Sequence, residues 1–331
     1  MITATDLEVR AGVRTLLTAP GPALRIQSGD RIGLVGRNGA GKTTTLRILA
    51  GEGEPYAGSV VRTSDLGYLP QDPRAGDPEQ LARTRILDAR GLGSIVLELQ
   101  QAGVEMGSDE PAVAEKAMAR YSRLTDRFQS LGGYSAEAEA AAIASNLNLP
   151  DRILGQPLST LSGGQRRRIE LARILFSDAE TMILDEPTNH LDADSVVWLR
   201  GFLKAYQGGF IVISHDVALV EETVNRVFYL DGNRQVIDIY NMGWKHYLRQ
   251  READAERRKK ERANVEKKAT ALQLQAARFG AKASKAASAH QMVARAERML
   301  SGLDEVRAVE RVAKLRFPDP APVGKTPLQA H

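Results

Sequence analysis

Short apolar runs and helix-like apolar spacings follow one another along the chain, and the two patterns predict the order of its elements. Residues 1–30 mix short apolar runs with glycine and proline, which indicates short strands and turns. The apolar run 32–35 leads through a glycine-rich segment into 43–49, which predicts a strand, a loop and a helix. Further strand-like runs lie at 66–69, 182–184 and 210–213. Strands that alternate with helical segments favour an α/β fold with a parallel-sheet core.

Two other regions have a different character. Residues 72–160 are rich in alanine, glutamate and arginine, with glycine and proline breaks, which predicts an inserted helical subdomain. The stretch 249–277 holds no glycine or proline and predicts one long helix. Apolar residues at i, i+3 and i+4 spacing from Met292 to Leu303 predict a second, antiparallel helix, with a turn between about 278 and 289.

The charge is distributed unevenly, although the net charge is only +4. From Gly243 to Arg316 there are 19 Lys and Arg against 9 Asp and Glu, whereas the other 257 residues hold 26 against 32. A basic C-terminal segment on a mildly acidic body favours a polyanionic partner. The chain has no cysteine, which excludes thiol catalysis and Cys-ligated metal sites. It has no apolar run of 18 residues, so we expect no membrane insertion.

The glycine-rich segment Gly36-Arg37-Asn38-Gly39-Ala40-Gly41-Lys42-Thr43 matches the pattern G-x-x-x-x-G-K-[ST]. It follows an apolar strand and opens a helix, where backbone N–H groups can surround phosphate oxygens. We expect Lys42 to neutralise the β- and γ-phosphates and the Thr43 hydroxyl to ligate Mg²⁺. Together with Thr44, this segment is the predicted ATP-binding loop.

A second set of candidates lies at strand ends. Asp185 and Glu186 end an apolar strand, where the first carboxylate would hold Mg²⁺ and the second would orient and deprotonate the attacking water. Such a pair alone is more often a solvated edge, but a phosphate-binding loop in the same chain favours the functional interpretation. His215 follows the strand 210–213 and is expected beside the γ-phosphate. Gln71, just after 66–69, is a candidate for contact with the metal and the water.

The segment Leu161-Ser162-Gly163-Gly164-Gln165 precedes a helix-forming run. Ser162 and Gln165 have the spacing of a capping box, which is the structural interpretation. Two adjacent glycines exceed what a cap needs and expose N–H donors at a helix N-terminus. We therefore predict a second anion site here.

In this order, the motifs resemble those of the ATP-binding cassette (ABC) ATPases over about residues 1–240. Residues 36–43 resemble the Walker A loop, residue 71 the Q-loop and residues 161–165 the family signature. Residues 181–186 are similar to the Walker B strand, 190–192 to the D-loop and 215 to the switch histidine. The resemblance implies a P-loop ATPase cassette with a parallel-sheet core, an antiparallel β subdomain and a helical subdomain at about 72–160. It also implies ATP and Mg²⁺ as cofactors.

The sequence Glu186-Pro187-Thr188-Asn189-His190-Leu191-Asp192 is similar to the variant typical of the ABC-F subfamily, whose members carry two cassettes and no membrane domain. There, a basic helical hairpin links the cassettes, and residues 241–317 resemble that linker. The tail 318–331 would then lead to a second cassette in a longer protein. Without it, we expect pairing as a homodimer and weak hydrolysis. The resemblance implies a cytoplasmic ATPase that acts on the ribosome, at the tRNA exit site, in translation control or antibiotic resistance.

The basic hairpin supports the ribosome hypothesis because ribosomal RNA is a dense polyanion. The candidates for RNA contacts at or beside its turn are Arg278, Lys282, Lys285 and Arg295. The ATPase subunit of a membrane transporter stays open as an alternative, although the hairpin has no evident role there. A DNA-associated ATPase resembling the SMC proteins is disfavoured, because those proteins insert their coiled coil between the Walker motifs.

The chain departs from the ABC pattern at one position. The family usually stacks the adenine on an aromatic residue near the first β-turn, and Ala11 stands there in this chain. We expect Arg10 or Arg14 to cover the base instead.

Overall fold

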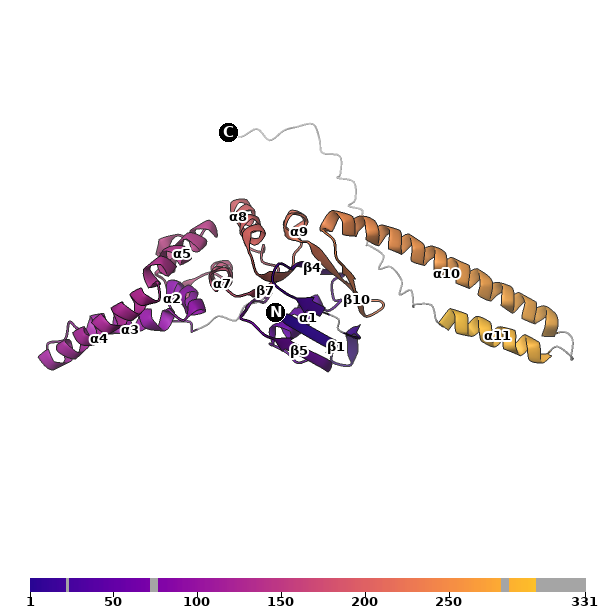
Figure 1. Ribbon diagram of the computed structural model, residues 1–331, viewed down its shortest axis with the longest axis horizontal. Coiled ribbons are helices and arrows are strands. Elements are labelled where there is room, and N and C mark those ends of the chain that lie inside the picture. The colour runs from indigo at the N-terminus through magenta and orange to yellow at the C-terminus, as the bar shows by residue number, and fades with distance from the viewer. Residues whose placement is uncertain (22–23, 72–76, 281–285, 302–331) are drawn as a thin grey trace, which may run out of the picture.

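The computed structural model describes residues 1–21, 24–71, 77–280 and 286–301. It has a central sheet, a smaller antiparallel sheet, a group of helices on one side and two long helices on the other (Figure 1). None of the helices in these ranges combines the length and the apolar character that a membrane crossing needs.

The central sheet has six strands. Their order across the sheet is β10 (Val236–Tyr240), β9 (Arg226–Asp231), β4 (Arg31–Gly36), β8 (Gly209–Ile213), β7 (Thr181–Asp185) and β6 (Leu66–Leu69). Only β10 is antiparallel to its neighbour; the other pairs are parallel. Every residue of β7 and β8 is buried, as expected of parallel strands that are covered on both faces. The carboxyl ends of β4, β7 and β8 therefore meet at one edge of the sheet.

The smaller sheet covers the helix that follows β4. Its strands are β1 (Ile2–Ala11), β2 (Arg14–Ala19), β3 (Leu24–Ile26) and β5 (Ala57–Arg62), and β1 pairs antiparallel with the other three. The buried residues of β1 are Ile2, Ala4, Leu7 and Val9, which is the period of a strand with one face on a core, shifted by one residue where the register is irregular between Thr5 and Glu8. Helix α1 (Lys42–Ala50) lies in that core through Leu46 and Leu49, between the two sheets. This packing fixes the glycine-rich loop at the start of α1.

The helical subdomain expected at about 72–160 contains five α-helices among the described residues: α2 (Ala82–Leu87), α3 (Gly93–Glu105), α4 (Pro111–Ser130), α5 (Gly133–Asn146) and α6 (Asp151–Leu154). Two 3₁₀ helices lie at Asp88–Arg90 and Leu158–Thr160. Helices α8 (Ala193–Ala205) and α9 (Val217–Thr223) follow β7 and β8.

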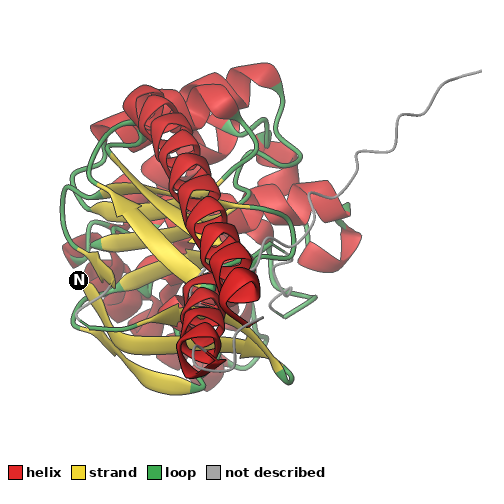
Figure 2. Cartoon of the chain, turned by 90° about the vertical axis from the view of Figure 1, so that its right-hand side faces the viewer, coloured by secondary structure: helices red, strands yellow, loops and turns green. Residues whose placement is uncertain are grey.

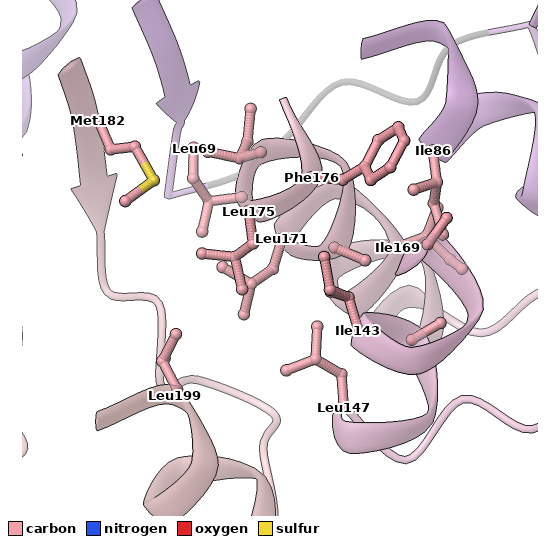
Figure 3. Close-up of a cluster of buried hydrophobic side chains, with 14 of the residues drawn as sticks. Leu69, Ile86, Ile143, Leu147, Ile169, Leu171, Leu175, Phe176, Met182 and Leu199 are labelled. Atoms are coloured by element: carbon pink, nitrogen blue, oxygen red, sulfur yellow. The ribbon is translucent and has the colours of Figure 1, made fainter. Parts of the chain in front are cut away.

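Helix α7 (Gly163–Phe176) joins the helical group to the central sheet. Figure 3 shows Leu171 and Leu175 of α7 close to Leu69 at the end of β6, in one buried cluster that also contains Met182 of β7. The same cluster includes Ile143 of α5, so α7 packs on both parts. A displacement of α7 would therefore disturb its contacts with the sheet, because protein interiors are closely packed.

The two long helices are α10 (Trp244–Gly280) and α11 (Ala286–Ser301), and α11 lies beside α10 (Figure 1). The buried residues Ala269 and Ala276 of α10 and Ala296 of α11 are small, which lets two helix backbones approach closely. The stretch 302–331, which holds the predicted tail 318–331, lies outside the described residues.

Helix α10 begins five residues before the expected helix 249–277, and tertiary packing explains the difference. Tyr247 is fully buried, with ring centroids 5.1 Å from Tyr240 of β10 and 5.2 Å from Trp244. Farther along, the Arg251 guanidinium lies 4.6 Å from the Tyr229 ring centroid. Seen from the side of the long helices, α10 crosses in front of the strands (Figure 2). Its first turns therefore belong to the core, which charge patterning of the sequence did not reveal.

Replacing Tyr247 with alanine should lower the free energy of unfolding by about 3–5 kcal/mol, because it removes a fully buried aromatic side chain. Urea denaturation followed by circular dichroism would measure the loss. The control is Tyr121→Ala on α4, where the side chain is 41% exposed and should cost far less. Equal losses in the two variants would contradict the docking of α10 on the core.

Candidate functional site

The glycine-rich loop connects β4 to α1, and two of its glycines are required by close contacts. A Cβ atom at Gly36 would lie 2.6 Å from the carbonyl oxygen of Leu230, and one at Gly41 would lie 2.9 Å from the Leu16 side chain. Gly41 also has a φ of 101°, which L-residues rarely adopt. The loop therefore contacts β9 at its start and β2 at its end, and α1 begins at the next residue.

Lys42 folds back over this loop. Its Nζ donates hydrogen bonds to the carbonyl oxygens of Gly36 at 2.9 Å and Arg37 at 3.1 Å. Burial lowers the pKa of Lys42, and the negative charges of Glu186 and Asp185 oppose that shift. The ammonium group thus lies between the loop and the acid pair, which is where a phosphate group would need a counter-charge.

Asp185 ends β7 and is 1% exposed. The Thr43 hydroxyl hydrogen-bonds its carboxylate, while the buried Oδ2 has no hydrogen-bond partner among the described residues. Burial raises the pKa of Asp185, and the bond from Thr43 is the largest opposing effect. A buried carboxylate oxygen without a donor, next to a hydroxyl, is a donor set that suits Mg²⁺.

The metal would need further oxygens, because the described residues include no group of three or more His, Cys, Asp or Glu that could hold an ion. Mg²⁺ commonly takes one or two carboxylates together with waters and substrate phosphates. Thr43 and Asp185 therefore fit a metal that arrives with a nucleotide.

Glu186 meets His215 across the neighbouring strands β7 and β8. The Glu186 carboxylate accepts the His215 backbone N–H at 3.1 Å and lies 3.2 Å from His215 Nε2. Glu186 is 5% exposed, and its own N–H donates to the carbonyl oxygen of Ile213 at 2.9 Å. His215 and Glu186 therefore lie at the same edge as Asp185; the sequence predicted a place for His215 beside the phosphates but did not predict this contact with Glu186.

Gln71 follows β6 at the same edge of the sheet but is exposed. Its main-chain carbonyl accepts a hydrogen bond from Arg167. Within the described ranges, its side chain makes no hydrogen bond to Asp185 or Glu186. The structure therefore places Gln71 near the site without bringing its amide to the acid pair.

The segment 161–165 lies at the start of α7. Ser162 Oγ accepts the Gln165 N–H at 3.3 Å and the Gln165 side chain accepts the Ser162 N–H at 2.9 Å, which forms the expected capping box. A Cβ atom at Gly163 would meet open space, whereas one at Gly164 would lie 3.6 Å from His190. The helix start is therefore open at Gly163 and close to the segment 190–192.

Arg10 contacts other residues of the small sheet and its surroundings. Its guanidinium lies 3.4 Å from the Tyr56 ring centroid and 2.7 Å from the Glu8 carboxylate. Arg14 and Ala11 are exposed. Of the two arginines proposed to cover an adenine, Arg14 is the one without these contacts.

The structure describes two of the four candidate RNA contacts. Arg278 near the end of α10 and Arg295 on α11 are exposed. Lys282 and Lys285 lie outside the described residues.

One residue at the site was not foreseen from the sequence. Arg167 of α7 is 5% exposed and donates hydrogen bonds to the carbonyl oxygens of Asp185 and Glu186. The only sequence signal was its place in the run Arg166–Arg168, directly after the segment 161–165. Charge alone does not tell a buried arginine from its exposed neighbours.

A family model described as "ABC transporter" matches residues 21–189, and a second model with the same description matches 230–317. The tylosin resistance ATP-binding protein TlrC of Streptomyces fradiae is 34% identical over 316 residues, 91% of this chain and 56% of TlrC. The energy-dependent translational throttle protein EttA of Escherichia coli K12 is 36% identical over 205 residues, 61% of this chain and 36% of EttA. The chain thus spans about half or less of the length of these relatives.

Solved structures share the fold. The ATP-binding subunit of an ABC transporter has a TM-score of 0.53 at 17% identity, covering 73% of this chain and 90% of that chain. A dimeric ATP-binding cassette with ADP and phosphate has a TM-score of 0.51 at 18% identity, covering 74% of this chain and all of that chain. The predicted α/β cassette fold is confirmed, and the chain belongs to the ATP-binding cassette family and, within it, to the ABC-F subfamily.

Proposed function

We propose that this chain binds ATP with Mg²⁺ at the loop 36–44 and hydrolyses it with Glu186 as the general base. The observation that carries the proposal is the convergence of Lys42, Thr43, Asp185 and Glu186 at one edge of the central sheet. These groups supply a cation for the phosphates, a metal-binding pair and a carboxylate for the water.

Each residue has a distinct role in this mechanism. The loop amides and Lys42 bind the phosphates, and Thr43 and Asp185 hold the metal, which neutralises phosphate charge when it is bound. Glu186 accepts the proton of the attacking water. His215 orients the Glu186 carboxylate through its backbone N–H and holds Nε2 3.2 Å from it. Gln71 lies at the same edge and would ligate the metal only if its exposed side chain turned inward.

The domain boundaries follow from the same proposal. We propose that residues 1–240 form the cassette and that 241–317 form a basic linker, whose described part consists of α10 and α11. The segment 161–165 lies on α7 and makes no hydrogen bond to the loop 36–44 within the described residues. A complete site therefore takes this segment from another cassette, either in a longer protein or in a homodimer.

The wider role proposed is action on the ribosome in the cytoplasm, in translation control or antibiotic resistance. Two relatives support it by name, one as a translational throttle protein and one as a tylosin resistance protein. The linker of this chain supports it through charge, because proteins that neutralise RNA phosphates need clustered Lys and Arg.

One face of α10 suits such contacts. Lys260, Lys267 and Arg278 are exposed and are spaced by 7 and 11 residues, which brings them to the same side of a helix. Tyr247 and Ala276, which are buried, lie on the opposite side by the same helical period. The three cations span about 27 Å at 1.5 Å per residue, long enough to follow a nucleic-acid backbone.

Glu186→Gln should leave ATP affinity within about twofold and slow hydrolysis by about 10²–10⁴-fold, the usual contribution of a general base. Lys42 and the loop bind the phosphates, so affinity and turnover should separate. Fluorescent-nucleotide binding and single-turnover hydrolysis measure the two quantities. Glu180→Gln, an exposed glutamate just before β7, is the matched control and should keep the normal rate. Hydrolysis by Glu186→Gln at the rate of the unmodified chain would exclude Glu186 as the base.

The triple variant Lys260→Ala, Lys267→Ala and Arg278→Ala should bind purified ribosomes more weakly and with a shallower salt dependence. Each lost phosphate contact reduces the slope of log K against log salt by about 0.7–0.9, so the total change should reach about 2–3. Sedimentation with ribosomes at several salt concentrations measures it.

The matched control for this experiment removes the same charge from the cassette, through Arg25→Ala, Arg83→Ala and Arg152→Ala. All three of these arginines are exposed. If both triple variants show the same affinity and slope, the linker face does not contact RNA.

A further inference from the structure

The arginine that follows the signature segment reaches two parts of the ATP site at once. From α7, Arg167 Nη1 donates to the carbonyl oxygen of Pro70 at 3.0 Å and to that of Gln71. Its Nη2 donates to the carbonyl oxygens of Asp185 at 2.8 Å and Glu186 at 2.9 Å. Nη1 thus binds the segment 70–71 after β6, and Nη2 binds the segment 185–186 after β7.

This arrangement depends on the shape of the side chain. The guanidinium is planar and rigid, so its two terminal nitrogens hold a fixed separation, and it stays charged at all ordinary pH values. The strands β6 and β7 are parallel neighbours, so their carboxyl ends lie side by side. The Arg167 side chain bridges the two ends through these hydrogen bonds.

Glu186 needs such support because its backbone is strained. Its φ is 52°, a left-handed conformation that is uncommon outside glycine, and it precedes Pro187. A conformation of this kind costs about 1–3 kcal/mol and persists only where its surroundings over-determine it. The Glu186 N–H is held by Ile213 and its carboxylate by His215. Its carbonyl oxygen accepts the Arg167 Nη2–H at 2.9 Å and, at the longer distance of 3.3 Å, the Asn189 N–H.

We propose that Arg167 is a positioning residue for ATP hydrolysis, which fixes the main chain of Glu186 and links it to the signature helix α7. The inference rests on the role of Glu186 as the base. Arg167 lies two residues after Gln165, within the first two turns of α7, so a shift at the start of this helix moves the guanidinium and with it the Glu186 peptide. A catalytic carboxylate displaced by 1 Å can lose about 10²-fold in rate.

The test is Arg167→Lys, which keeps the positive charge but offers a single nitrogen that cannot serve both segments. We expect kcat for ATP to fall by about 10- to 100-fold, with KM within about twofold, because the loop 36–44 is untouched. Arg167→Gln, in which one amide group can serve only one segment, should show the same separation. Steady-state hydrolysis over a range of ATP concentrations, at high concentration of the whole chain, measures kcat and KM, and thermal unfolding is followed in parallel.

The matched control is the next residue, Arg168. Its Nη1 donates to the carbonyl oxygens of Leu147 at 3.1 Å and Asn148 at 2.9 Å, so it also binds main-chain carbonyls, but away from the acid pair. Arg168→Lys should therefore lower the unfolding temperature by a similar amount and keep kcat within about twofold. An equal loss of kcat in the two lysine variants would reduce Arg167 to a packing role and overturn the proposal.

A double variant separates positioning of Glu186 from other effects. If Arg167 acts through Glu186, adding Arg167→Lys to Glu186→Gln should cause no further loss of rate. Independent, additive losses would overturn the proposal, as would a normal kcat in Arg167→Lys while Glu186→Gln is slow. A normal rate in Glu186→Gln itself would instead refute the proposed role of Glu186, so the two failures are distinguishable.

Discussion

The candidate site depends on the parallel arrangement of β4, β7 and β8. Parallel strands bring their carboxyl ends to one edge, so Gly36, Asp185 and Ile213 end their strands side by side although they are far apart in the chain. The loop after Gly36 supplies Lys42 and Thr43, and the residues after Asp185 and Ile213 supply Glu186 and His215. No single segment could make this site, and a change in strand order would disperse it.

The second constraint is the burial of α7 and α10 against the same core. Helix α7 carries the segment 161–165 at its start and Arg167 one turn later, and it packs on both the sheet and the helical group. Helix α10 is docked by Tyr247, while its far end carries exposed cations such as Arg278. Both helices are thus anchored on the cassette core, α7 along its length and α10 through its first turns.

The sequence predicted the parts of the fold that local patterns determine. The glycine-rich loop, the apolar strand before Asp185 and the helix-breaking residues are local signals, so the cassette fold could be expected. The contact of His215 with Glu186 was not predicted, because only the expected place of His215 beside the phosphates followed from the strand order. The start of α10 could not, because Trp244 and Tyr247 become helical through contacts with β10 rather than through charge patterning. Arg167 was missed for a related reason, since its role depends on four carbonyl groups from two distant segments.

All of these arrangements serve one proposed activity, the binding of ATP together with Mg²⁺ at one edge of the sheet. The most direct measurement is calorimetric titration of ATP with and without Mg²⁺, into the unmodified chain and into Asp185→Asn. We expect Mg²⁺ to strengthen ATP binding to the unmodified chain and Asp185→Asn to lose this gain, because the buried carboxylate no longer carries charge for the metal. Affinity without Mg²⁺ should change little. An equal gain from Mg²⁺ in both chains would exclude Asp185 as a ligand of the metal at this edge.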